Sequence, residues 1–518
     1  MDETGKKPAT GGAPQVDAEG YTPEQAEEVA RIRADHSFIG HPKGVSALSV
    51  AHLCWIFAKY ACSSILIYYL YKGAMEGGLG FSELEATQLI SVYTTMFSMC
   101  GIVGSIVADK ILGARRALMA SRIMEAVAYT CLAVPLGIPG YAVSQVLLCC
   151  SAMIGGRSGE SMFGKMYEKT DNRRDTAFTI MYVFQNIGAA VPFVSGAVAA
   201  IAGYNVAFTL PAIASAIGAL GLIVSDKRFF GPIGAFPDDP MPAAQRRSFT
   251  VKLVATVVAL FAVAGIVLGI AKVGLSQFLT ALSTVTLFIP FVYFFYIVFS
   301  HKTTKVERPR VLALIPMFIG GVVTFMVWMQ NTTIISQYIE STIDRTVFGI
   351  EFSAASYQTI PAILAIIFGS AYSLLWNKLG KRQPNMPAKM GIGSIFWGLG
   401  LLVMVGPFLL YPDAEANSVS SIWPVLFFVL IMLGEGCTIP SGFSAASAVA
   451  PKAFTTQMLS VWILSQSAGS SAAALIANFY TPGNEVMYFI GVSMIPIAVG
   501  VLLVLFSRKL AQVMGIAA

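Results

Sequence analysis

The stretch LVATVVALFAVAGIVLGI, from Leu253 to Ile270, contains no charged residue. A second stretch of the same character, from Phe278 to Ser300, follows after a short interval. An α-helix needs about 20 apolar residues to cross the roughly 30 Å hydrocarbon core of a bilayer. Because lipid cannot pair with exposed backbone groups, stretches of this length and composition predict membrane-spanning helices.

The rest of the chain repeats this pattern. Of its 518 residues, 56% are hydrophobic and only 12% are charged, whereas about 25% are charged in a soluble domain. Divided at glycines, prolines and charge clusters, the apolar blocks predict an all-α polytopic membrane protein with fourteen spans. The predicted spans are 45–71, 84–108, 114–136, 141–167, 175–202, 205–225, 251–271, 276–300, 311–338, 353–376, 388–411, 420–449, 455–479 and 486–507.

The charged residues between the spans predict the orientation. Alternate loops are rich in Lys and Arg, as in Lys110–Arg116, Lys227–Arg228 and Lys302–Arg310. The intervening loops carry fewer basic residues and several acids, such as Glu340 and Asp413. Because cytoplasmic loops are enriched in basic residues, we expect both termini to be cytoplasmic. The net charge of +6 therefore predicts basic loops and no nucleic-acid surface.

The spacing of the spans divides the chain into six segments. Residues 1–40 are predicted to be a polar cytoplasmic tail with a short helix from Thr22 to Arg33. Two groups of six spans, at 41–226 and 310–518, flank two extra spans at 251–300. Linkers at 227–250 and 301–309 join these parts, and the first of them is rich in proline.

Other classes of protein find no support in the sequence. The seven cysteines lie inside apolar blocks without metal-type spacing, and the four histidines are scattered. No nucleotide-binding loop, zinc motif or catalytic triad is recognisable. We expect no cofactor, no metal and no enzymatic activity.

Several motifs resemble those of the proton-coupled oligopeptide transporters, a family of the major facilitator superfamily. They are His41-Pro42-Lys43-Gly44, the loop Gly104–Asp109 with Gly113–Arg116, the stretch Asn172–Gly188, Asp344–Gly349, Gly434-Glu435 with Pro440, and Trp462. The resemblance implies two six-helix bundles around a cavity that opens alternately to each side, with the two extra helices outside. It also implies that Asp109, Arg115 and Arg116 lock neighbouring helix ends on the cytoplasmic side.

The chain departs from this family in its first span. The family's Glu-x-x-Glu-Arg motif falls at His52, Trp55 and Ile56, so its three charges are absent. A further family Arg falls at Ser63, and the Lys of span four falls near Arg157. The acidic residue expected in span nine falls at Met329, beside Gln330. The chain is therefore expected to be a divergent, bacterial-type member.

Charged residues inside the spans are candidates for the site, because each costs at least about 2.5–3.5 kcal/mol to insert at mid-bilayer. Glu435 lies mid-span near Pro440, and the resemblance implies that it receives a peptide amino group. Lys59 shares a helical face with His52 and Trp55. It could hold a substrate carboxylate, or it could pair with a structural Glu. Glu435 and His52 are the candidates for proton coupling.

Two pairs of opposite charge stand three residues apart. Arg157 and Glu160 could pair with each other, or Arg157 could bind substrate. Arg122 and Glu125 are interpreted as a structural bridge near the cytoplasmic end of span three. The remaining predicted substrate-binding residues are Tyr60, Tyr182, Asn186, Gln330 and Trp462.

The predicted function is alternating-access import of di- or tripeptides or peptide-like small molecules, coupled to protons through atypical residues. The alternatives are a facilitator or carrier of another amphoteric metabolite, and a transporter-like receptor. We expect a monomer in the plasma (inner) membrane whose partners are a small-molecule substrate, protons and the lipid bilayer.

Overall fold

The computed structural model describes residues 21–168, 171, 173–347, 349–412, 414–451 and 454–516. In these ranges, thirteen helices are long and apolar enough to cross a membrane. The remaining predicted span is α4 (Ala114–Ala133), which is less apolar because it carries Arg115, Arg116, Arg122 and Glu125. This helix packs along α5 (Gly137–Gly155) and α10 (Thr209–Ser225). All fourteen predicted spans therefore correspond to helices.

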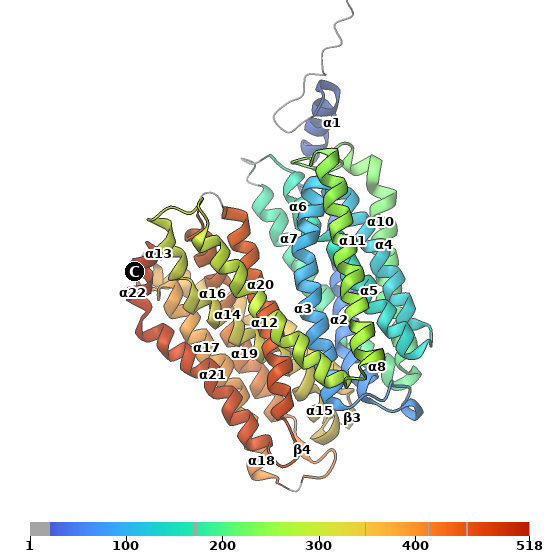
Figure 1. Ribbon diagram of the computed structural model, residues 1–518, viewed down its shortest axis with the longest axis vertical. Coiled ribbons are helices and arrows are strands. Elements are labelled where there is room, and N and C mark those ends of the chain that lie inside the picture. Colours follow the sequence, from blue (N-terminus) through green and yellow to red (C-terminus); the bar gives the residue numbers. More distant parts are fainter. Residues whose placement is uncertain are drawn as a thin grey trace, which may run out of the picture.

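The first six spans form one bundle, coloured blue to green in Figure 1. It contains α2 (Lys43–Tyr71), α3 (Glu83–Val107), α4, α5, α6 (Ser158–Lys165), α7 (Arg173–Ala189), α8 (Pro192–Ala202), α9 (Tyr204–Ala207) and α10. Short helical turns join them at η1 (Ala74–Glu76), η2 (Ala108–Leu112) and η3 (Asp226–Phe230).

The last six spans form the second bundle, coloured yellow to red (Figure 1). It contains α13 (Glu307–Leu312), α14 (Ile315–Gln330), η5 (Asn331–Ile335), α15 (Ser336–Thr342), η6 (Ala354–Gln358), α16 (Thr359–Leu379), η7 (Gly380–Arg382), α17 (Met386–Val403), α18 (Val405–Leu410), α19 (Ile422–Ala448), α20 (Thr455–Ile476), η9 (Ala477–Phe479), α21 (Glu485–Leu505) and α22 (Ser507–Met514). Helices α13 to α15 with η5 make one continuous span.

Four two-residue strands, which the sequence analysis did not predict, lie at one end of the second bundle (Figure 1). Strand β1 (Ile343–Asp344) pairs in parallel with β4 (Val419–Ser420). Strand β2 (Thr346–Val347) pairs in antiparallel with β3 (Ile350–Glu351). They tie together two loops that follow long helices.

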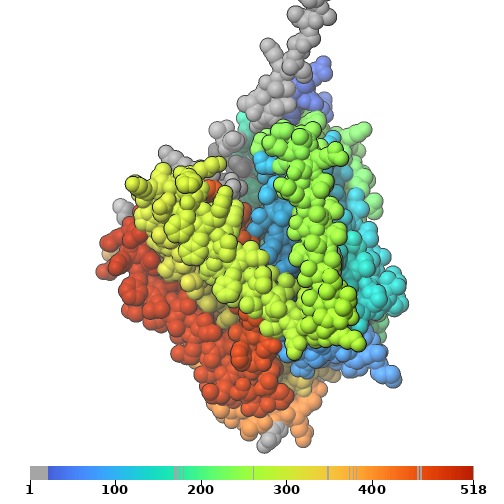
Figure 2. Space-filling model, in the orientation of Figure 1, coloured from blue at the N-terminus to red at the C-terminus, as the bar shows by residue number. Residues whose placement is uncertain are grey.

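The two extra spans lie on the outside of the bundles, as expected. Helix α11 (Ala243–Gly265) continues into η4 (Ile266–Ile270), and none of the residues in its most apolar stretch is buried. It begins at Ala243 instead of 251, so the predicted linker is partly helical. Helix α12 (Leu275–Phe299) packs against both α3 and α20. Figure 2 shows α11 and α12, in green and yellow-green, at the surface.

The predicted amino-terminal helix is present as α1 (Pro23–Arg33). Thr22 caps it, because its side chain accepts from the Gln25 backbone while the Gln25 side chain accepts from the Thr22 backbone. Figure 1 shows α1 at one end of the first bundle, on the side where the carboxyl terminus of the second bundle also lies. The first 20 residues of the predicted tail lie outside the described residues.

The two bundles meet at the end that carries the strands. There Lys72 Nζ lies 3.0 Å from Glu340 Oε1, and the Tyr68 hydroxyl donates to the Ser336 carbonyl at 3.2 Å. Gly196 approaches so closely that a Cβ atom on it would lie 2.9 Å from Ala355 Cβ. At the opposite end, which carries α1, Figure 2 shows a hollow between the bundles. The structure is therefore closed at the strand end and open at the α1 end.

Candidate functional site

A cavity of about 310 Å³ lies between the bundles. The first bundle contributes side chains from α2 to α6, and the second contributes side chains from α14, η5, η6 and α20. The charged residues of its wall come from the first bundle, whereas the second bundle contributes the apolar Phe325, Trp328 and Met329 together with uncharged polar residues. A cavity between two bundles that touch at one end is the arrangement that rocking of the bundles can expose to either side.

A break between α5 and α6 brings Arg157 to this cavity. Gly156 ends α5 with φ of +49°, and a Cβ atom on it would lie 2.2 Å from the Ser105 backbone nitrogen of α3. Only glycine avoids both the strained backbone and the clash. The predicted span 141–167 therefore consists of two helices. Arg157 Nη1 lies 2.8 Å from Glu160 Oε1, so the predicted pairing is present.

Lys59 also lines the cavity, from α2. Within the part of the chain that the structure describes, its ammonium group has no hydrogen bond or ion pair, and the like charge of Arg157 is close enough to repel it. The neighbouring Tyr60 lines the same wall. Lys59 is thus a free cation in the cavity, which favours a role in binding an anionic group over a structural pair.

Glu435 lies in α19 across from Tyr60, whose hydroxyl is close enough to interact electrostatically with the carboxylate. Its glycine neighbours let α19 pack closely. A Cβ atom on Gly434 would lie 2.6 Å from Trp397, and one on Gly436 would lie 2.3 Å from Tyr372. Among the described residues, the Glu435 carboxylate has no hydrogen-bond or ion-pair partner. It does not itself line the cavity.

Two predicted binding residues point away from the cavity. Gln330 is fully buried and accepts a hydrogen bond of 2.8 Å from the Tyr488 hydroxyl inside the second bundle. The neighbouring Met329 lines the cavity instead. Trp462 is 4% exposed and fills the space beside Gly442, where a Cβ atom would lie 1.7 Å from the indole ring. Both residues are core residues, because each side chain points to a neighbouring helix of its own bundle.

The other predicted residues lie near the cavity without lining it. Tyr182 is exposed on α7 and faces Gly369 of α16 in the second bundle. The Asn186 amide donates to the Tyr182 carbonyl at 2.8 Å. His52 is buried against Trp55 and Phe163, with Nε2 3.4 Å from the Gln185 amide oxygen. Only Lys59, Tyr60 and Arg157 of the predicted set are in the cavity wall.

Arg122 and Glu125 belong to the cavity wall, although the sequence predicts them only as a structural bridge. Both line the cavity, and Arg122 Nη1 lies 2.7 Å from Glu125 Oε2. The Arg122 guanidinium lies over the Trp55 ring at 4.5 Å. The three-residue spacing correctly predicts the ion pair. It does not show that the pair lines the cavity, which is why we interpreted the pair as a structural bridge near the cytoplasmic end of the span. The position of Trp55 opposite it could not be read from one helix alone.

The predicted lock at the α1 end has a different partner. Arg115 Nε lies 2.9 Å from Asp226 Oδ1 at the end of α10, so Asp226, not Asp109, is its carboxylate. Arg116 lies over the Phe236 ring at 5.8 Å. Asp109 contributes its backbone carbonyl, which accepts from the Asp239 amide at 3.1 Å. The motif therefore ties η2 and α4 to the segment after α10.

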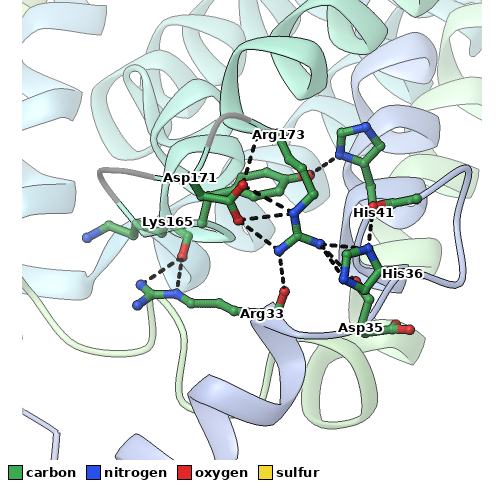
Figure 3. Close-up of polar contacts among 9 residues, drawn as sticks. Arg33, Asp35, His36, His41, Lys165, Asp171 and Arg173 are labelled. Carbon is green, nitrogen blue, oxygen red and sulfur yellow. Dashed lines mark hydrogen bonds and ion pairs between the residues drawn. The ribbon is translucent and has the colours of Figure 1, made fainter.

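A second polar cluster at this end joins the amino-terminal segment to α7 (Figure 3). Arg173 contacts both carboxylate oxygens of Asp171 and donates to the Arg33 carbonyl at 2.8 Å. Its guanidinium also lies 3.2 Å from His36 Nδ1. His41 Nδ1 lies 2.6 Å from the Tyr167 hydroxyl. Asn172, which begins the signature stretch, lies outside the described residues.

Comparison with known proteins gives consistent matches over nearly the whole chain. The sequence profile of the POT family (PTR2) matches residues 160–493. A di-/tripeptide transporter of Lactococcus lactis subsp. lactis (strain IL1403) is 31% identical over 93% of this chain and 98% of the relative. An uncharacterized transporter of Bacillus subtilis (strain 168), YclF, is 30% identical over 94% of this chain and 98% of the relative.

Solved structures agree. A crystal structure of peptide transporter POT in complex with sulfate is 30% identical, with a TM-score of 0.90 over 95% of this chain and 99% of that one. A POT family transporter in complex with 5-aminolevulinic acid is 28% identical, with a TM-score of 0.85 over 92% of this chain and 98% of that one. The two bundles have the major facilitator fold, and the relatives are multi-pass membrane transporters and not enzymes.

Proposed function

This chain belongs to the POT family, and from that premise we propose that it imports di- or tripeptides, or peptide-like molecules, by alternating access coupled to protons. The relative from Lactococcus is a di-/tripeptide transporter, and related structures hold alafosfalin and a thioalcohol-conjugated peptide. The proposal combines this family membership with one charge in the cavity wall and one charge beside the cavity.

The observation that carries the proposal is a pair of opposite charges on opposite bundles. Lys59 of the first bundle and Glu435 of the second have no ion-pair partner among the described residues. A peptide at neutral pH has a carboxylate at one end and an ammonium at the other. A molecule that places its carboxylate at Lys59 and its ammonium at Glu435 links the two bundles. Charge-assisted hydrogen bonds of this kind are roughly twice as strong as neutral ones.

Tyr60 supports this assignment because it follows Lys59 directly in α2 and interacts electrostatically with Glu435. It lines the cavity, and its hydroxyl faces Glu435. Arg157 adds a second cation beside Lys59, although Glu160 partly neutralises it. Phe325, Trp328 and Met329 provide an apolar surface for substrate side chains.

One chain contains both bundles and the complete cavity, so we propose that the transporter acts as a monomer. We also propose that it resides in the plasma (inner) membrane with both termini in the cytoplasm, because the basic loops lie at the α1 end. In that orientation the structure is open to the cytoplasm and closed to the outside.

Uptake of labelled dialanine into proteoliposomes tests the proposal. We expect accumulation above the external concentration when the outside is more acidic, and equilibration only when no pH gradient is imposed. Equilibration that ignores the gradient would instead indicate a facilitator. Wild-type protein that neither takes up nor exchanges dialanine would contradict peptide transport.

A carrier of another amphoteric metabolite is the second candidate, and one observation favours it. A structurally similar POT transporter was crystallised with 5-aminolevulinic acid, which has one amino and one carboxyl group like a dipeptide. Competition between dialanine and 5-aminolevulinic acid for uptake separates the two, because the preferred substrate inhibits at the lower concentration.

A further inference from the structure

The Arg122–Glu125 ion pair is the most buried pair of charges in the cavity wall. The side chains are 9% and 4% exposed, and Nη1 of the arginine lies within 2.7 and 2.9 Å of the two carboxylate oxygens. By comparison, Arg157 and Glu160 are 55% and 28% exposed. Breaking a buried pair leaves an uncompensated charge, whereas an exposed pair exchanges readily with water.

The surroundings offer Glu125 few other partners. The Ser151 hydroxyl of α5 lies 3.4 Å from its Oε1 atom. Titratable groups near the pair include Tyr129 of α4, Tyr93 of α3, and His52 and Cys54 of α2. Helix α6 also packs against α4, and its Glu160 is already paired with Arg157. Helix α10, which packs on the other side of α4, contains no titratable residue. Arg122 is therefore the only cation of the described residues that contacts Glu125, and loss of this contact leaves the Glu125 carboxylate buried without a charge partner.

Arg122, in contrast, keeps a second support when Glu125 is neutral. Its guanidinium lies over the Trp55 ring at 4.5 Å, and a cation in this position is attracted by the face of the ring. Trp55 precedes Lys59 by one helical turn, so both residues lie on the same face of α2. The Arg122 guanidinium thus remains in the cavity wall over Trp55, and Trp55 lies one helical turn from Lys59.

We propose that Glu125 is the site that binds the transported proton, and that its protonation releases Arg122 to bind the substrate carboxylate together with Lys59. This inference rests on the proposed function. A proton from the cavity water binds the Glu125 carboxylate, and the Arg122–Glu125 pair separates. Arg122 then binds the carboxylate of the substrate in place of the carboxylate of Glu125. Because linkage is reciprocal, substrate binding favours protonation of Glu125 by the same factor.

Glu125→Gln in proteoliposomes tests the inference, with two readouts. The first is dialanine counterflow, which needs no pH gradient and also shows that the variant is folded. The second is acidification of the lumen, followed with trapped pyranine when dialanine is added outside. Glutamine leaves Arg122 free but cannot bind the proton. We therefore expect counterflow to persist, while acidification is lost and dialanine only equilibrates across the membrane under an imposed gradient.

Two further variants guard against misfolding and against a general effect of lost charge. Arg122→Gln with Glu125→Gln replaces the ion pair by two amides, which avoids an unpaired buried charge. This double variant should also lack substrate-driven acidification. Glu415→Gln removes a carboxylate from an exposed loop far from the cavity and should acidify the lumen like the wild type.

The outcomes distinguish the inference from the function on which it rests. The inference is supported if Glu125→Gln shows counterflow at the wild-type level but no acidification of the lumen. If Glu125→Gln accumulates dialanine to the wild-type level, or if Glu160→Gln alone uncouples transport, Glu125 is not the proton site. If the wild type shows no dialanine counterflow at all, the proposed function itself fails, and the inference fails with it.

Discussion

Glu435 illustrates how much a single residue can reveal in a membrane protein. A carboxylate in an apolar helix is costly to insert into the membrane. The Glu435 carboxylate nevertheless has no partner among the described residues. Lys59 presents the complementary case on the other bundle. Both were identified from the sequence because a charge within an apolar stretch is conspicuous, whatever direction its side chain takes.

Glu435→Gln should therefore weaken dialanine uptake strongly without unfolding the protein. Glutamine keeps the size and hydrogen bonding of the side chain but removes the charge that a substrate ammonium needs. Hydrogen bonds to charged groups contribute about 1.5–3 kcal/mol, so the apparent affinity should fall by roughly ten- to a hundredfold. The measurement is concentration-dependent uptake in proteoliposomes. Unchanged uptake would reduce Glu435 to a structural residue.

Other residues could not be assigned from the sequence, because their side-chain direction depends on neighbouring helices. Gln330 and Met329 are adjacent, yet only Met329 faces the cavity while Gln330 contacts Tyr488. Trp462 fills a space that exists because position 442 is glycine. A resemblance to other proteins at these positions predicts the residue type and not the direction in which it points.

The packing of Trp462 leads to a prediction about stability. Gly442→Ala places a methyl group 1.7 Å from the indole ring, which must then move. Overpacking costs about 1–3 kcal/mol, more than the roughly 0.5–1 kcal/mol that alanine gains over glycine in a helix. We expect a lower melting temperature in detergent. Gly491→Ala is the matched control, because no atom lies within 4 Å of the added carbon and stability should not fall.

At the scale of elements, the sequence predicted the spans well because hydrophobic length is a local property. Their internal breaks were not predicted. The break at Gly156 depends on the approach of α3 to α5, which involves residues far apart in the chain. The predicted start of α11 is too late because Arg246 and Arg247 resemble a loop, although charged residues can continue a helix beyond the membrane. The short strands pair loops that only the fold brings together.

The amino-terminal segment is an element whose docking should depend on pH. Burial lowers the pKa of His41, the Arg173 charge lowers it further, and Asp171 opposes this shift. The docked segment therefore favours neutral His41. As pH falls through about 6.5, His41 of the detached segment takes up a proton more readily than His41 of the docked segment, so acid favours the detached state. The pKa of Asp171 is also lowered, by Arg173, so its protonation affects docking only at much lower pH.

Acidification below about pH 6.5 should consequently loosen α1 from the bundle. Hydrogen exchange of residues 23–33 should be slow at pH 7.5 and faster at pH 5.5, after correction for intrinsic exchange. His41→Gln retains a hydrogen-bonding partner for Tyr167 but has no titratable ring, so its exchange should show no such change. Equal pH dependence in wild type and variant would contradict this role of His41.

At the scale of the whole molecule, the distribution of charges predicts the orientation. Arg228 and Ala414 are exposed at opposite ends of the molecule. In a background without native cysteines, Ala414→Cys should react with an impermeant maleimide on intact cells. Arg228→Cys should react only after permeabilisation. Labelling of both on intact cells would overturn the proposed topology.

The arrangement of the two bundles gives the last prediction. The bundles touch at the strand end, where Gly196 and Ala355 would place their Cβ atoms 2.9 Å apart. The Cβ atoms of a disulfide are about 3.8 Å apart, so a small adjustment lets cysteines at both positions bond. If transport requires this end to open, oxidation of Gly196→Cys with Ala355→Cys should stop dialanine uptake, and reduction should restore it.

The control for this cross-link lies within one bundle. A Cβ atom on Gly218 would lie 3.0 Å from Cys54 Cβ, and both residues belong to the first bundle. Oxidation of Gly218→Cys, with Cys54 as the only other cysteine, ties α10 to α2 but leaves the bundles free to move against each other. Uptake should then survive oxidation. Full activity of the oxidised Gly196–Ala355 cross-link would show that the bundles need not separate at this end, which alternating access by rocking requires.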